Sequence, residues 1–179
     1  MIFEELRLNG AFLIRLEPRR DARGFFARAF CCREFEALGL DSVTAQSNLC
    51  HNASKGTLRG MHFQRAPHAE TKIVRCIRGG VFDVIIDLRR GSPTFASWVG
   101  NELTQENRLA LYVPRGFAHG YLTLTDDTEV LYQVSEPYHP ESEGGVRWDD
   151  PALRISWPMA APMVSAKDSN FPDFRGEAL

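Results

Sequence analysis

Short runs of β-branched, aromatic and other apolar residues, separated by Gly, Pro, Asn and Asp, dominate the pattern of this chain. Runs of this length and composition predict β-strands. Only one segment, residues 32–38, has a helical pattern, and it ends before Gly39. The Gly79-Gly80 pair between two apolar runs predicts a hairpin turn. We expect strands at residues 12–16, 25–30, 43–46, 57–63, 72–77, 81–88, 110–113, 118–122 and 130–134.

Many short strands with almost no helix favour an all-β fold, and this pattern alone leaves a sandwich, a barrel and a jelly roll open. From about Pro137 onward the chain becomes rich in Pro and Trp. Because this part keeps large apolar side chains, we expect ordered loops packed over the sheets rather than a free linker. The chain shows no repeat and no boundary, so we expect residues 1–179 to form one domain.

Composition narrows the class of protein. A length of 179 residues suits one domain with a full-sized core. The 21 Lys+Arg and 23 Asp+Glu give a net charge of −2, which argues against a nucleic-acid partner. No apolar run is long enough for a membrane span, and the N-terminus has two acids where a signal peptide begins with bases. The sequence therefore predicts a soluble, cytoplasmic protein that binds neither nucleic acid nor membrane.

The four cysteines give no indication of a disulfide or metal site, whereas the three lysines are candidates for specific roles. No two cysteines form a C-x-x-C pair, and a reducing compartment would leave all four as small apolar residues. Only three of the 21 basic residues are lysines, so each lysine is a candidate for a specific task.

The first candidate for chemistry is the strand segment that contains His62. On a strand, His62 and Gln64 point to one face, which we expect to face a cavity or water, while Met61 and Phe63 point to the other. A lone strand histidine is usually structural. Lys72 opens the next predicted strand, and an antiparallel pairing of the two strands would bring its ammonium close to His62.

A second candidate is the P-x-G-x-x-H pattern of residues 114–119, which resembles the second motif of the cupins. In metal-binding cupins this histidine is a ligand, and the first motif supplies two more histidines. Here the first motif holds His62 alone. His62, His119 and Glu70 would make a depleted set for zinc or iron, which want three or four ligands.

Two further polar groups have ordinary structural explanations. Tyr132 lies on the same strand face as Val130 and Val134, as a core tyrosine would. Asp168 belongs to a polar cluster, residues 165–168, that a solvated charge pair would explain. The carboxylate of Asp168 could instead orient a histidine and fix its tautomer.

Taken together, these segments resemble the dTDP-4-dehydrorhamnose 3,5-epimerase family of nucleotide-sugar enzymes. The resemblance runs over nearly the whole chain in the family's order. One departure is Arg28, where family members commonly carry Glu at the nucleotide end of the site. The matching segments are residues 21–26, 55–64, 83–89, 91–95, 114–120, 147–150, 155–158 and 165–168, together with Tyr132 and Tyr138.

The resemblance implies a cupin-type jelly roll with short peripheral helices, a homodimer, a nucleotide-diphosphate sugar as substrate, and neither metal nor organic cofactor. It implies that His62 is the general base, that Asp168 orients it, that Tyr132 is the general acid and that Lys72 lies by the oxyanion. The remaining implied roles concern binding. Arg59 and Arg23 would hold the diphosphate, with Arg23 reaching in from the partner chain. Tyr138 would stack on the base. The other residues that would line the site are Gln46, Asn48, His119, Glu143 and Lys167.

These roles suit the reaction that the resemblance implies. A ketone at C4 of the sugar acidifies the hydrogens at C3 and C5, and their removal puts negative charge on the C4 oxygen, which an ammonium can stabilise. Inversion needs a base on one face of the ring and an acid on the other. Histidine and tyrosine have suitable pKa values for these tasks. The alternatives are a metal-dependent cupin that uses His62 and His119, and a sugar-binding cupin without catalysis.

Overall fold

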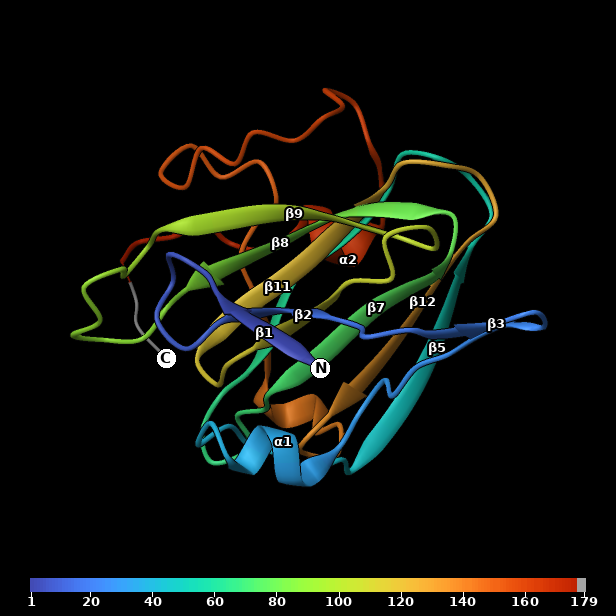
Figure 1. Ribbon diagram of the computed structural model, residues 1–179. Coiled ribbons are helices and arrows are strands. Elements are labelled where there is room, and N and C mark those ends of the chain that lie inside the picture. Colours follow the sequence, from blue (N-terminus) through green and yellow to red (C-terminus); the bar gives the residue numbers. More distant parts are fainter. Residues whose placement is uncertain (177–179) are drawn as a thin grey trace.

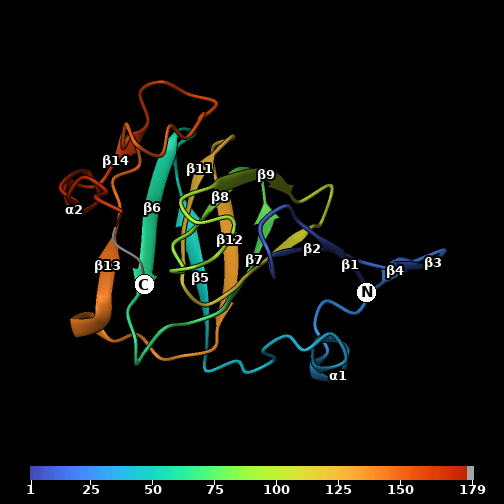
Figure 2. The ribbon, with the colours of Figure 1, turned by 90° about the vertical axis from the view of Figure 1, so that its left-hand side faces the viewer.

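The chain folds into two six-stranded sheets that pack face to face (Figures 1 and 2). The structure is a computed structural model that describes residues 1–176. The first sheet has the order β1-β2-β10-β7-β12-β5. Its strands are β1 (Ile2–Glu5), β2 (Phe12–Arg15), β5 (Gln46–Asn52), β7 (Lys72–Arg78), β10 (Ala110–Val113) and β12 (Thr128–Val134).

The second sheet has the order β13-β6-β11-β8-β9, with β14 added parallel to β6. The core between the two sheets takes side chains from both, for example Val74 and Val130 from the first and Ile85 and Tyr121 from the second. The strands of the second sheet are β6 (Thr57–Gln64), β8 (Gly80–Asp87), β9 (Trp98–Thr104), β11 (Phe117–Thr123), β13 (Glu143–Gly145) and β14 (Met163–Val164).

The segment from residue 138 to residue 176 is ordered and covers the outer face of the second sheet, as the sequence predicts. It contains a short 3-10 helix η1 (Pro140–Ser142), β13, β14 and the helix α2 (Ala166–Ser169). A second apolar cluster forms between this segment and the sheet, with Met61 of β6 and Ile86 of β8 packed against Val146, Leu153 and Trp157. Both faces of the sheet that carries β6 are therefore buried.

The predicted hairpin at Gly79-Gly80 is wrong. β7 lies in the first sheet and β8 in the second, so these glycines form a corner at which the chain crosses between sheets. Gly79 has a φ of +72°, and a Cβ there would lie 2.4 Å from Oγ1 of Thr125. The predicted pairing of the strands that carry His62 and Lys72 is also wrong, because β6 lies in the second sheet and β7 in the first. His62 and Lys72 face each other from different sheets.

The other differences from the predicted elements have simple causes. Residues 43–46 were expected as a strand, but the strand β5 begins only at Gln46 and runs through polar residues to Asn52. Its inward side chains line a polar cavity, so an apolar pattern does not mark it. The strand expected at residues 25–30 is limited to β4 (Gly24–Phe26), which pairs only with β3 (Arg19–Asp21).

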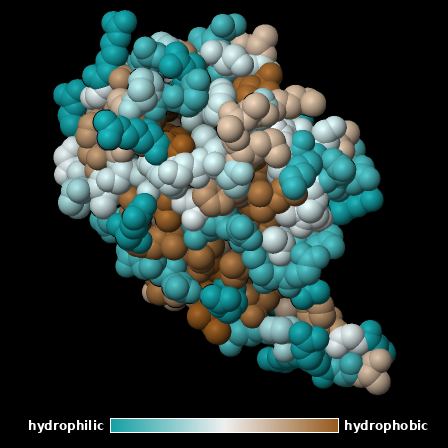
Figure 3. Space-filling model, turned by 90° about the horizontal axis from the view of Figure 1, so that it is seen from above, coloured by the Kyte–Doolittle hydropathy of each residue, from teal (hydrophilic) through white to brown (hydrophobic). Residues whose placement is uncertain are grey.

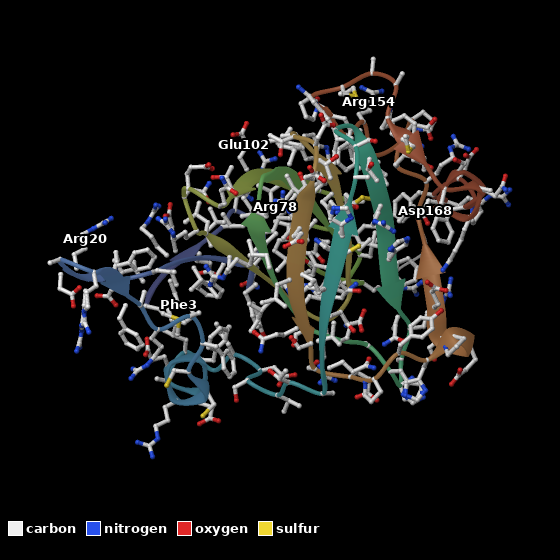
Figure 4. All side chains as sticks on the ribbon, turned by 90° about the vertical axis from the view of Figure 1, so that its right-hand side faces the viewer. Phe3, Arg20, Arg78, Glu102, Arg154 and Asp168 are labelled. Carbon is white, nitrogen blue, oxygen red and sulfur yellow. The ribbon has the colours of Figure 1, made fainter. Side chains whose placement is uncertain are left out.

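The β3–β4 hairpin projects from the body of the protein (Figures 1 and 4). Every residue of both strands is exposed. In Figure 4 the labelled Arg20 of this hairpin lies at one side of the molecule and the labelled Asp168 at the opposite side. The hairpin therefore cannot contact the segment around Asp168 in the same chain.

The helices are short. α1 (Cys32–Glu36) lies within the predicted residues 32–38. Gly39, which follows this segment, has a positive φ. Within residues 1–176, no helix is long and apolar enough to span a membrane.

A buried carboxylate holds the turn after β8. Asp87 has no exposed surface and accepts hydrogen bonds from Ser92 at 2.5 Å, Thr94 at 2.7 Å and the Arg89 guanidinium at 2.8 Å. Burial alone would raise the pKa of Asp87, but these donors outweigh it and lower the pKa from 3.8 to about 2. The folded state is therefore favoured where this carboxyl is ionised.

We expect Asp87→Asn to lower the free energy of unfolding by about 2 kcal/mol at pH 7. Because the pKa is depressed in the folded state, this contribution is complete above pH of about 4 and disappears as the pH falls through about 2. Urea unfolding of both proteins at pH 7 and pH 2 measures it. Asp149→Asn, in an exposed ion pair with Arg147, is the matched control and should change little. An equal deficit of Asp87→Asn at both pH values would contradict this role.

Candidate active site

A pocket of about 410 Å³ opens between the two sheets. Its walls come from β5, β7 and β12 on one side and from β6 with the segment after Pro137 on the other. Seven of the twelve residues predicted for the site line it: Gln46, Asn48, His62, Lys72, Tyr132, Tyr138 and Glu143.

His62 is held by a carboxylate from the C-terminal segment. Its Nε2 lies 2.8 Å from Oδ1 of Asp168, which is only 4% exposed. A carboxylate accepts the proton of Nε2, so Nδ1 is left with its lone pair. The ring of Phe171 meets the imidazole edge to face at 5.9 Å and restricts it further.

The backbone of β6 helps to hold the same carboxylate. The N–H of Gly60 donates to Oδ2 of Asp168 at 3.2 Å, and the hydroxyl of Ser165 caps the backbone N–H of Asp168. Gly60 has a φ of +140°, and a Cβ there would lie 2.5 Å from the Cα of Gly120, so the position requires glycine. Burial raises the pKa of Asp168, but the hydrogen bond with His62, the charge of that imidazole, the Gly60 N–H and Lys167 together outweigh burial, and the net shift is downward.

Tyr132 stands on the opposite sheet, on β12. Burial raises the pKa of its phenol, and the nearby Cys50 and Glu70 add to the shift, which Arg59 opposes. The phenol is therefore protonated at neutral pH and can donate a proton into the pocket.

Lys72 lies on the same sheet as Tyr132. Its ammonium is 3.0 Å from Oε1 of Glu70, and the two side chains are about one-tenth exposed. The other oxygen of Glu70 accepts from Nε2 of Gln64 at 3.0 Å. This chain of contacts fixes a positive charge inside the pocket between the two sheets.

A ring of polar contacts surrounds the mouth of the pocket. Gln46 accepts a hydrogen bond from the backbone N–H of Tyr138 at 2.9 Å, and the Tyr138 hydroxyl donates to Glu143 at 2.9 Å. The ammonium of Lys167 donates to the other oxygen of Glu143. Burial raises the pKa of Glu143, but the contacts with Lys167 and Tyr138 together lower it, and the contact with Glu143 raises the pKa of Lys167. The ring of Tyr138 is about half exposed and available for stacking.

A second hollow of about 480 Å³ adjoins the pocket and shares His62 with it. Arg59, Lys167 and Asp168, also predicted for the site, line this hollow. Nε of Arg59 donates to Asn52 at 2.8 Å, which orients the guanidinium. The pocket thus continues into a region that carries two permanent positive charges.

Two predicted residues lie elsewhere. His119 is buried and does not line the pocket, although it lies opposite His62 on the paired strand β11, and its Nε2 lies 3.0 Å from both oxygens of Asp83. Arg23 is at the tip of the β3–β4 hairpin, with a side chain 89% exposed and paired with Asp21. Arg28, the departure from the family pattern, pairs with Glu34.

The metal set considered from the sequence is not assembled. His62 contacts Asp168, His119 contacts Asp83 and Glu70 contacts Lys72. In the described part of the chain, the ligand atoms of His62, His119 and Glu70 are not close enough together to share one ion.

Sequence reasoning missed some of the lining. Gln64 is assigned to the same strand face as His62, which was the available signal, yet it was not named as a site residue. Glu70 was named only as a metal ligand, although it precedes the rare Lys72 by two residues. Phe63 and Val134 also line the pocket, and nothing in their apolar character distinguishes them from core residues.

Comparisons with known proteins show the family to which the chain belongs. The sequence profile of the dTDP-4-dehydrorhamnose 3,5-epimerase family matches residues 5–176. The enzyme of that name from Sinorhizobium fredii is 46% identical over 173 residues, which cover 96% of this chain and 89% of the relative.

Solved structures give the same result. The dTDP-4-dehydrorhamnose 3,5-epimerase of Bacillus anthracis, with TDP and pyrophosphate bound, is 40% identical with a TM-score of 0.93, over 97% of this chain and 99% of that one. The Legionella pneumophila epimerase in complex with dTDP-4-keto-L-rhamnose is 36% identical with a TM-score of 0.87, over 94% and 89%. The predicted cupin-type jelly roll is confirmed by these neighbours. The chain therefore belongs to the dTDP-4-dehydrorhamnose 3,5-epimerase family of isomerases.

Proposed function

We propose that this protein inverts C3 and C5 of a dTDP-linked 4-keto-6-deoxyhexose. The observation that carries the proposal is the placement of His62 and Tyr132 on facing sheets of one pocket, with Lys72 in the same pocket. Family membership over residues 5–176 supports the substrate class, as do the nucleotide and keto sugar bound to two of the related structures.

His62 acts as the general base in this proposal. Its Nε2 is engaged by Asp168, so Nδ1 removes the proton from the carbon next to the C4 ketone. The ionised Asp168 then stabilises the imidazolium that forms, as a carboxylate does in other His–Asp pairs. The buried position of the carboxylate keeps the imidazole in one orientation throughout the reaction.

Lys72 stabilises the negative charge that develops on the C4 oxygen. Glu70 holds the ammonium in the pocket before the substrate arrives, so little reorganisation is needed when the charge develops. Tyr132 then delivers a proton to the opposite face of the ring from the one that His62 deprotonates. Burial of its phenol keeps this proton available at neutral pH.

The nucleotide portion extends toward the charged mouth of the site. Arg59 and Lys167 bind the diphosphate, for which a permanently charged guanidinium fork is well suited. Tyr138 stacks on the base, and Gln46 holds its backbone in place. Asn48, opposite Tyr132 on the paired strand, and Glu143 complete the lining.

A homodimer would complete the site. The hairpin that carries Arg23 projects away from the pocket of its own chain, so this guanidinium can reach a pocket only in a second copy. Apolar side chains are exposed on the hairpin and on the first sheet, with Phe26 71%, Leu49 62% and Ile77 42% exposed. Figure 3 shows apolar groups gathered between the projection and the body. These features support a dimer in which Arg23 contributes to the partner's diphosphate site.

The division of labour between His62 and Tyr132 can be tested with a dTDP-linked 4-keto-6-deoxyglucose in heavy water. His62→Ala should reduce both deuterium uptake at C3 and C5 and net inversion by about 10³-fold, because no base remains. Tyr132→Phe should retain uptake while inversion falls by about 10²-fold or more, because proton removal persists without delivery to the other face. NMR of the recovered sugar separates the two signals.

Matched controls are His51→Ala and Tyr112→Phe, which alter a histidine on β5 and a buried tyrosine on β10 outside the pocket. Both should behave as the unmodified protein. Equal loss of uptake and inversion in the two site variants would overturn the assignment, and activity that chelators abolish would favour a metal-dependent reaction.

The contribution of Arg23 can be tested with a heterodimer of one Arg23→Ala chain and one His62→Ala chain. If Arg23 serves the partner's site, one of the two sites is complete, and we expect about half the activity of the unmodified dimer. Differently tagged chains and steady-state kinetics provide the measurement. Activity no higher than that of the Arg23→Ala homodimer, or a protein that is monomeric in solution, would reject the shared site.

A further inference from the structure

Two loops beside the pocket bring two histidines and a glutamate together. His68 lies in the turn between β6 and β7, and Glu136 and His139 lie between β12 and η1. Oε1 of Glu136 is 3.2 Å from Nδ1 of His68 and 3.7 Å from Nε2 of His139. The three ligand atoms all lie within 4.8 Å of one another. The reaction proposed for the pocket uses none of these three side chains.

The spacing suits a small divalent ion. Ligand atoms that surround one ion at about 2.0–2.1 Å in a tetrahedron lie about 3.3 Å apart, close to the 3.2 Å and 3.7 Å that separate Glu136 from the two histidines. The two imidazole rings are stacked, with centroids 3.5 Å apart and planes 12° apart, so one ring has to turn out of the stack for both lone pairs to reach one ion. All three side chains are between 28% and 30% exposed, which leaves room for water to complete the coordination.

One buried side chain fixes the backbones of both histidines. Gln64 is 4% exposed. Its Nε2 donates to the carbonyl of His68 at 3.2 Å and to that of Pro137 at 3.1 Å, and its Oε1 accepts from the N–H of His139 at 2.6 Å. The loops are also joined by hydrogen bonds between Thr71 and Ser135. The two loops that carry the ligand residues are therefore held in place before any ion binds, which lowers the entropic cost of ion binding.

A second carboxylate sets the tautomer of one histidine. Oε1 of Glu141 lies 3.1 Å from Nδ1 of His139. A carboxylate at this position accepts the Nδ1 proton, so the lone pair is on Nε2, the atom that faces Glu136. Histidines that bind metals commonly have such a carboxylate behind them, and it raises the basicity of the ligating nitrogen.

We propose that His68, Glu136 and His139 bind one divalent transition-metal ion, with Zn²⁺ the best match to two imidazoles and a carboxylate. Among first-row metals, imidazole nitrogen favours Zn²⁺, Ni²⁺ and Cu²⁺, whereas Mg²⁺ and Ca²⁺ prefer oxygen ligands. The ion joins the β6–β7 loop to the β12–η1 segment. Its role is to clamp two loops whose neighbouring residues, Gln64 and Tyr138, line the pocket.

Titration of EDTA-treated protein with ZnCl₂ in a calorimeter tests the site. We expect one ion per chain, with affinity at least about 100-fold weaker in His68→Ala and in His139→Ala. Glu141→Gln, which removes the carboxylate behind the ligand, should weaken binding about 10- to 100-fold. His51→Ala is the control, since His51 forms an exposed pair with Asp127 and is not a proposed ligand, and its affinity should match that of the unmodified protein.

The proposed role of the ion in joining the two loops is tested by thermal unfolding. Zn²⁺ should raise the melting temperature of the unmodified protein and of His51→Ala but not that of His68→Ala or His139→Ala. Epimerase activity in EDTA, equal in all four proteins, shows that the variants are folded. Absence of saturable binding, unchanged affinity in both histidine variants, or a melting temperature that Zn²⁺ does not raise would each overturn the proposal.

Discussion

The hydrogen bond between His62 and Asp168 joins the two parts of the fold on which the proposed chemistry depends. Asp168 is 106 residues away in sequence, and it reaches β6 only because the segment after Pro137 folds back over the second sheet. β14 pairs with the start of β6, and Ser165 caps the turn that carries Asp168. The Gly60 N–H donates a hydrogen bond to the other oxygen of the Asp168 carboxylate. The packing of the C-terminal segment therefore determines where the Asp168 carboxylate lies, and this carboxylate fixes the orientation of the His62 imidazole.

The two-sheet architecture supplies the other constraint. An acid and a base that act on opposite faces of a ring must be separated by about the thickness of that ring, and side chains on one strand cannot provide this arrangement. Facing sheets can, because β6 and β12 each direct one group into the space between them. The chain crosses from the second sheet to the first between β6 and β7, which places Lys72 on the sheet that carries Tyr132, so the ammonium and the phenol share a wall.

Sequence reasoning was most accurate where side-chain period and burial agree. The strands from β6 to β8 and from β10 to β12 are apolar on their core-facing side and were predicted nearly to their ends. β5 was not, because its inward residues are polar and line the pocket. The Gly79-Gly80 corner was mistaken for a hairpin, since two glycines between apolar runs permit either a tight turn or a crossing between sheets. Residue composition does not distinguish these two outcomes, which depend on long-range pairing. The roles of the site residues were assigned through the family resemblance, and their assembly from distant segments of the chain required the fold.

A crystal structure with an unreactive dTDP-linked analogue of the 4-keto sugar tests the central claim most directly. The proposal places Nδ1 of His62 and Oη of Tyr132 on opposite faces of the hexose ring, each within about 3–3.5 Å of the atom it serves, with Nζ of Lys72 beside the C4 oxygen. A ring bound with both groups on the same face, or bound outside the pocket between the two sheets, would contradict it.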